Sequence, residues 1–166
     1  MQTIGMGIKS MALGGLVAAL LLGAPFASGA EQTRESYTAQ VEPICKSNTE
    51  ASGRILKGVK GIVRAGKLTV AGAKFTKAAQ ALKKTLNQLR AVPPPTADKA
   101  RLEKWLGYIK EEVELLERTA QKLKAGNKTG AQEMAVRLTY TANRANNQVL
   151  SFEFKYCRAN PSQFAG

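Results

Sequence analysis

Apolar and small residues recur along the chain at alternating steps of four and three residues. This spacing turns one face of each helix toward a shared core, so it predicts four amphipathic helices. No segment alternates apolar and polar residues with a period of two for long enough to predict a strand. The four sets of repeating positions are Val41, Cys45, Asn48, Ser52, Ile55, Val59, Ile62; Leu68, Gly72, Phe75, Ala79, Leu82, Leu86, Leu89; Leu102, Leu106, Ile109, Val113, Leu116, Ala120, Leu123; and Ala131, Ala135, Leu138, Ala142, Ala145, Val149, Phe152, Tyr156.

Helix-breaking residues separate these segments. Gly66 is expected to divide the first helix from the second, Pro93-Pro94-Pro95 to end the second, and Gly126 to end the third. Within the first helix, Gly53, Gly58 and Gly61 each cost about 1 kcal/mol relative to alanine. Four helices joined by short loops predict an all-α, up-down-up-down four-helix bundle over residues 31–166.

Capping residues mark the helix starts. Thr96 or Asp98 is expected to cap the third helix, and Thr129, with Gln132 three residues later, forms a capping-box pattern for the fourth. The last helix is expected to run to Cys157, and the tail from Arg158 onward to be loose.

The first 30 residues have the order of a cleavable signal peptide. Lys9 precedes an apolar run from Met11 to about Pro25, and small residues, Ser28 and Ala30, precede a cut before Glu31. The run is shorter than the roughly 20 residues that span a bilayer. We therefore expect a secreted, periplasmic or cell-envelope protein exported by the general secretion route, with an uncleaved membrane anchor as the alternative.

The chain has two cysteines, Cys45 and Cys157, and both lie in the part expected to be exported. The start of the first helix and the end of the fourth lie at the same pole of an up-down-up-down bundle. We therefore expect an intramolecular disulfide, with an intermolecular bridge or two free thiols as alternatives.

Basic residues dominate residues 46–90, where Glu50 is the one acidic residue, and the whole chain has a formal net charge of +13. This pattern predicts an anion-binding surface for an envelope polymer or acidic lipid, and the alternative is a solvated outer face. Phe75 is the one aromatic residue in this run, which argues against sequence-specific nucleic-acid binding. The predicted anion-binding residues are Lys57, Lys60, Arg64, Lys67, Lys74, Lys77 and Lys84.

The chain contains no histidine. Ser-His-Asp and Cys-His nucleophilic sites and histidine-ligated metal or haem sites are therefore excluded. The acidic cluster of Glu111, Glu112, Glu114 and Glu117 lies among lysines and arginines, so we interpret it as a solvated helix face rather than a carboxylate pair for glycoside hydrolysis. We expect a non-enzymatic protein without a metal or cofactor.

Some apolar residues lie off the repeating positions. On the third helix these are Trp105, Tyr108 and Leu115. They either widen the core or form a surface for another exported protein or a second copy of the chain.

Several short motifs follow one another along the part of the chain after the expected signal peptide. They are Tyr37 through Ile44-Cys45, Leu86 through Leu89 followed by Pro94-Pro95, Trp105, Gly126-Asn127, and Tyr156-Cys157. In these the chain resembles a loose group of exported bacterial helical proteins of uncharacterised function, in which a tyrosine and a cysteine open the mature domain and a cysteine closes the last helix. The resemblance spans nearly the whole mature chain. It implies a disulfide-closed helical bundle outside the cytoplasm, and no particular reaction or ligand.

Together these features predict a basic, exported binding module that engages an anionic envelope component. A protein-interaction or inhibitor module is the alternative, and an enzyme a more distant one.

Overall fold

The computed structural model describes residues 31–160, and this part of the chain is all-helical, with no β-strand. The all-α prediction is confirmed, whereas the expected leader, residues 1–30, lies outside the described residues. The elements are α1 (Arg34–Leu56), α2 (Val59–Arg64), α3 (Leu68–Arg90), α4 (Lys99–Lys124) and α5 (Lys128–Gln148), with the 3-10 turns η1 (Thr96–Asp98) and η2 (Leu150–Phe152).

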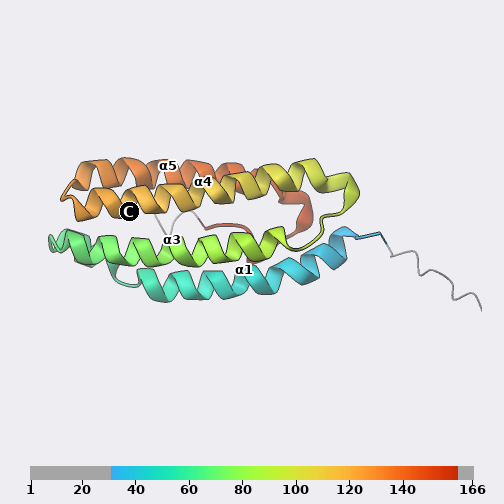
Figure 1. Ribbon diagram of the computed structural model, residues 1–166, viewed down its shortest axis with the longest axis horizontal. Helices are drawn as coiled ribbons and strands as arrows, with labels where there is room; N and C mark the ends of the chain where they lie inside the picture. Colours follow the sequence, from blue (N-terminus) through green and yellow to red (C-terminus); the bar gives the residue numbers. More distant parts are fainter. Residues whose placement is uncertain (1–30, 161–166) are drawn as a thin grey trace, which may run out of the picture. The chain divides into compact units, whose positions relative to one another are not determined.

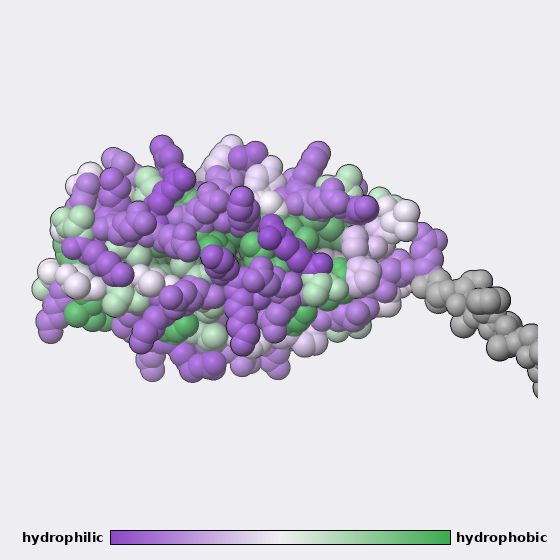
Figure 2. Space-filling model, viewed as in Figure 1, coloured by the Kyte–Doolittle hydropathy of each residue, from purple (hydrophilic) through white to green (hydrophobic). Residues whose placement is uncertain are grey.

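The long helices α1, α3, α4 and α5 lie alongside one another (Figure 1). α1 packs along α3, α3 along α4, and α4 along α5. α1 and α5 make little direct contact. The segment after η2 joins them, through hydrogen bonds to Glu42 of α1 and to Asn146 of α5. On the face drawn in Figure 2, hydrophilic side chains cover the helices and apolar side chains show along the middle.

The largest cluster of buried apolar side chains lies at the end of the bundle where α1 and α4 begin. Tyr37, Leu102 and Trp105 are each only 1% exposed. Phe152 and Phe154, from the segment after α5, pack against Tyr37 and Trp105 respectively, with ring centroids 6.0 and 5.6 Å apart. Aromatic rings from three parts of the chain thus close this end of the core.

Gly72 allows α3 to approach α4 closely. A Cβ atom at this position would lie 2.8 Å from Cγ of Lys124 and 2.9 Å from the carbonyl oxygen of Ala120. This explains why a glycine occupies a core position of α3 despite its low helix propensity.

The first helix ends earlier than its apolar pattern predicts. The repeat continues to Ile62, but the helix stops at Leu56 and a separate short helix, α2, begins at Val59. Gly58 adopts a left-handed conformation with φ of 74°, which glycine tolerates without the steric cost of a Cβ atom. The predicted breaks at Gly66, after α2, and at Gly126, after α4, are confirmed.

The last helix also ends earlier than predicted. Expected to run to Cys157, α5 stops at Gln148. After η2, Glu153 adopts a left-handed conformation. Phe152 contacts Tyr37 near the start of α1, so the segment that follows runs along α1 toward Cys45.

Cys45 and Cys157 form the predicted intramolecular disulfide, with Cα atoms 5.0 Å apart. The Glu42 carboxylate accepts hydrogen bonds from the backbone amides of Tyr156 and Cys157, each at 3.0 Å. These bonds satisfy two backbone amides that lie outside the helices and so have no helical hydrogen-bond partner.

The beginning of the expected loose tail is held in place. Asn146 of α5 donates from its side-chain nitrogen to the Ala159 carbonyl oxygen and accepts at its side-chain oxygen from the Ala159 amide, both at 2.8 Å. The prediction of a loose tail is therefore wrong for Ala159. Residues 161–166 lie outside the described residues.

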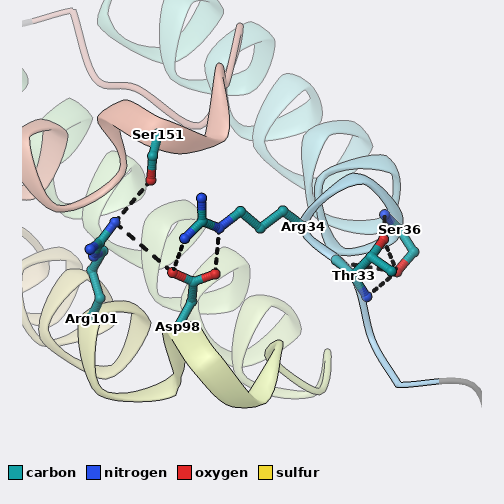
Figure 3. A network of polar contacts seen from close by, with 6 residues as sticks. All are labelled: Thr33, Arg34, Ser36, Asp98, Arg101 and Ser151. Carbon is teal, nitrogen blue, oxygen red and sulfur yellow. Dashed lines mark hydrogen bonds and ion pairs between the residues drawn. The ribbon is translucent and has the colours of Figure 1, made fainter.

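An ion pair joins the start of α1 to the start of α4 (Figure 3). The Arg34 guanidinium donates two hydrogen bonds to the Asp98 carboxylate, at 2.6 and 2.8 Å. Arg34 also lies over the Phe152 ring, 5.5 Å from its centroid. Because Arg34 is bonded to the Asp98 carboxylate, the pKa of Asp98 is held below its ordinary value.

Helix capping differs from the prediction at two starts. Asp98 precedes α4, as expected of a cap, but its side chain makes no capping hydrogen bond there, because Arg34 engages it instead. α5 is capped by Asn127 rather than Thr129, since the Asn127 side-chain oxygen accepts from the Gly130 amide at 2.7 Å.

Replacing Cys45 with serine is expected to lower the free energy of unfolding by about 4–5 kcal/mol, because the disulfide joins residues 112 positions apart and restricts the unfolded chain. Urea unfolding under oxidising conditions measures this. Reduced wild type is the control and should match the variant; equal stability of oxidised and reduced wild type would contradict the prediction.

Replacing Asp98 with asparagine is expected to lower the melting temperature at pH 7. The folded state holds the pKa of Asp98 below its ordinary value of 3.8, so the ionised carboxylate stabilises the fold above that pH. This stabilisation disappears as the pH falls through the lower pKa of the folded state. Thermal unfolding at pH 7 and at about pH 2 should show that the difference in melting temperature between wild type and Asp98→Asn is smaller in acid. Glu103→Gln, an exposed position on α4, is the matched control.

Candidate functional site

The predicted anion-binding residues are, with one exception, exposed on the surface. Lys57, Lys60, Arg64 and Lys67 lie around the turn that connects α1, α2 and α3. Lys77 and Lys84 lie further along α3. The chain thus concentrates positive charge at the α1–α2–α3 turn and extends it along one helix.

Lys74 is the exception. Its ammonium group donates to the carbonyl oxygens of Ile55 and Lys57, at 2.7 and 3.3 Å, at the C-terminal end of α1. A cation at this position satisfies carbonyl groups that have no partner within the helix and complements the helix dipole. Lys74 therefore holds the end of α1 to α3, a role that the prediction of an anion-binding lysine did not include.

An apolar groove lies beside this basic turn, between α2 and α5, and we call it the α2–α5 groove. Its volume is about 690 Å³. Phe75 and Leu123 form part of its floor, and Lys60, Arg64 and Lys128 lie at its edge. Among the described residues that line it, none is acidic. The groove thus combines an apolar interior with a cationic rim.

Small side chains on α5 leave room for this groove. Ala131 and Ala135 face α2 across it, and α2 has no fully buried residue of its own. Val59 and Val63 of α2 are only partly buried. Because α2 packs chiefly on α3, its apolar side remains open toward α5.

The predicted partner surface is not formed. Trp105 is 1% exposed and Leu115 is 4% exposed, so both belong to the core. Tyr108 is partly buried and its hydroxyl accepts a hydrogen bond from Arg144 at 2.9 Å. The structure therefore supports the alternative that these residues widen the core. The large apolar side chains that α5 does expose are Val136 and Tyr140.

A second hollow, which we call the Glu112 cavity, lies nearer the disulfide. It has a volume of about 280 Å³ and is lined by α1, α3, α4, α5 and the segment after η2. Apolar surface predominates in its wall, and the charged and amide residues that line it include Glu112, Asn48, Lys155 and Arg158. Leu56 borders both this cavity and the α2–α5 groove.

Glu112 is 7% exposed, so the interpretation of the acidic cluster as a solvated face is wrong at this residue. Burial raises the pKa of Glu112 to about 8, with a smaller contribution from the neighbouring charge of Glu111. Glu111 and Glu117 are exposed, as expected for the rest of the cluster.

A signal for the burial of Glu112 is present in the sequence. Glu112 lies seven residues after Trp105 and seven before Thr119, and all three are buried on one face of α4. The repeating apolar positions of α4, from Leu102 to Leu123, form a neighbouring row along the helix. Because residues seven positions apart lie on nearly the same face of a helix, a core position for Trp105 places Glu112 inside as well.

No protein-family model, curated protein or solved structure matches the chain. Within residues 31–160, no helix is both long and apolar enough to cross a membrane, and no group of three or more acidic or cysteine side chains is arranged to hold a metal ion. The two hollows and the basic turn are therefore the features from which a function is argued.

Replacing Glu112 with glutamine is expected to stabilise the protein at pH 8 and to have little effect at pH 4. The folded state keeps a proton on Glu112 up to about pH 8, whereas the unfolded carboxyl releases it near pH 4.5. Wild-type stability should therefore fall by about 1.4 kcal/mol per pH unit through this interval from Glu112 alone. Urea unfolding at pH 4 and pH 8 measures the change, and Glu117→Gln, which removes an exposed charge from the same helix, is the control. A variant no more stable than wild type at pH 8 would contradict the assignment.

Proposed function

We propose that this protein is an exported, non-enzymatic module that binds an anionic lipid of the cell envelope. One observation carries the proposal: an apolar groove whose edge bears Lys60, Arg64 and Lys128 and whose described lining has no acidic side chain. A hydrocarbon chain would occupy the groove, and the anionic headgroup would lie at the basic rim.

Both parts of a lipid find a complementary surface here. Burial of a hydrocarbon chain against Phe75, Leu123 and Val63 removes apolar area from water on both sides. The cations at the rim, and Lys57 and Lys67 close by in the chain, attract a phosphate or carboxylate headgroup.

The groove favours a lipid over an anionic polymer. A wall polymer or glycan would be bound by the exposed cations alone, and an apolar groove beside them would add nothing to its affinity. A lipid uses both surfaces.

Export and bundle topology belong to the same proposal. The signal-like order of residues 1–30 supports secretion by the general route, and the Cys45–Cys157 disulfide is compatible with an oxidising compartment. We also propose that the long helices alternate in direction as an up-down-up-down bundle, which is supported by the short α4–α5 connection at Ala125–Asn127. The absence of histidine supports a binding role rather than catalysis.

A second candidate is a protein-interaction module, and exposed apolar residues on α5 favour it. Val136 is 71% exposed and Tyr140 is 66% exposed, one helical turn apart. A partner that covers this pair would bind with little dependence on salt, unlike an anionic lipid.

We expect the double variant Lys60→Gln/Arg64→Gln to bind anionic phospholipid vesicles about 30-fold more weakly at low salt, since each basic residue at an anionic surface contributes about 1 kcal/mol. Vesicle co-sedimentation measures this. The matched control is Lys99→Gln/Lys104→Gln, which removes the same charge from the start of α4. These two residues lie about 20 positions before the groove residue Leu123, which is roughly 30 Å along the helix.

A variant that fills the groove distinguishes binding of an anionic lipid from binding of an anionic polymer. Ala135→Leu should weaken binding to anionic vesicles while leaving retention on a polyanion column unchanged, because it alters the apolar groove and no charge. Equal vesicle binding by wild type, by Lys60→Gln/Arg64→Gln and by Ala135→Leu would overturn the proposal. Salt-insensitive, stoichiometric capture of an envelope protein would favour the second candidate.

A further inference from the structure

Two polar groups of residues that line the Glu112 cavity, the Glu112 carboxyl and the Asn48 side-chain oxygen, have no hydrogen-bond partner among the described residues, and of the two the Asn48 oxygen is itself fully buried. No hydrogen bond or ion pair to the Glu112 carboxyl is formed within residues 31–160, although this side chain is 7% exposed. The Asn48 side-chain oxygen is also buried without a hydrogen-bond partner in this part of the chain. Asn48 comes from α1 and Glu112 from α4, and both line the same hollow.

Such an arrangement is costly for the protein alone. A buried polar group without a hydrogen bond costs about 1–3 kcal/mol, and an unpaired buried charge costs more. An apolar residue at position 112 would fill the core at no such cost. A carboxyl that faces a cavity is therefore explained by a ligand that supplies hydrogen-bond donors to it.

We infer that the Glu112 cavity binds a small organic amine, whose ammonium group donates to the Glu112 carboxylate and the Asn48 side-chain oxygen. The hydrocarbon part packs against Leu82, Ile109 and Leu116, which line the same cavity. This site is separate from the α2–α5 groove and does not depend on the lipid proposal.

Lys155 and Arg158 also line the cavity, but both are exposed residues. The more deeply placed Glu112 carboxyl and Asn48 oxygen favour an amine over other small molecules. An ammonium group has three donors and a charge opposite to the carboxylate, whereas an alcohol has one donor and no charge. A carboxylic acid would bring a second anion to Glu112. The cavity volume of about 280 Å³ suits a molecule of a few carbon atoms.

The chain contains one tryptophan, Trp105, and it lines this cavity, so its fluorescence reports occupancy. Titration with hexylamine, hexanol and hexanoate compares one hydrocarbon chain with three headgroups. We expect hexylamine to change Trp105 emission saturably and to bind at least tenfold more tightly than hexanol, with no saturable response to hexanoate. Hexanol binding as tightly as hexylamine would overturn the inference, because it would leave the cavity as a plain apolar pocket.

Glu112→Gln keeps the shape and a hydrogen-bond acceptor but removes the charge, and we expect at least tenfold weaker hexylamine binding. Glu117→Gln, exposed on the same helix, should bind as wild type does. Thermal unfolding monitored by circular dichroism establishes that each variant is folded. Equal affinity of Glu112→Gln and wild type for hexylamine would also overturn the inference. If Glu112→Gln does not fold, the comparison of hexylamine, hexanol and hexanoate on the wild-type protein still tests it.

The pH dependence of binding gives an independent readout. Because the pKa of Glu112 is about 8, formation of the ion pair below this pH releases a proton, and hexylamine affinity should fall about tenfold per pH unit from 8 to 6. The other titratable groups are Glu111, beside Glu112 on α4, and Lys155, Tyr156 and Arg158, which line the cavity from the segment after η2. The cavity linings from α1, α3 and α5 include no group that titrates in this range. Affinity that does not change between pH 8 and pH 6 would contradict proton release from Glu112.

Discussion

The Cys45–Cys157 disulfide holds the segment after η2 against α1, and the attachment of α1 to α5 depends on this bond. α1 packs along α3 but makes little contact with α5. The segment after η2 bridges the two helices, through the disulfide and the Glu42 carboxylate on one side and through Asn146 on the other. Without this bridge, the packing of α1 would rest on α3, on the contact between Tyr37 and Phe152 of η2, and on the Arg34–Asp98 ion pair.

The weak contact between α1 and α5 has a cost and a use. It forgoes the apolar burial that close packing of the two helices would gain. In return, one hollow lies beside the disulfide and another lies between α2 and α5, and Leu56 lines both. The two hollows differ in chemistry. One is lined by Glu112 and Asn48, with the exposed Lys155 and Arg158 from the segment after η2, and the other has cations around an apolar groove. We propose a positively charged ligand for the first and a negatively charged one for the second.

Two of the charged residues named from the sequence have roles that their charge alone did not reveal. Lys74 appeared to be one of a row of exposed cations, but the end of α1 lies within its reach and provides carbonyl oxygens. Asp98 appeared to be a helix cap, but Arg34, 64 residues earlier in the chain, engages its carboxylate. In both cases the partner comes from a distant part of the chain, so no local pattern identifies it.

The sequence by itself determined that this part of the chain is helical and which residues end most of the helices, and it favoured the pairing of the two cysteines that the structure shows. These features depend on local spacing, on glycine and proline, and on there being two cysteines to pair. Only the tertiary structure decided that Trp105 and Glu112 point inward, that α1 stops at Leu56, and that the chain leaves α5 at Gln148 to run along α1. The physical reason is that periodicity shows which side of a helix is apolar, but the width of the buried face depends on which helices and segments pack against it.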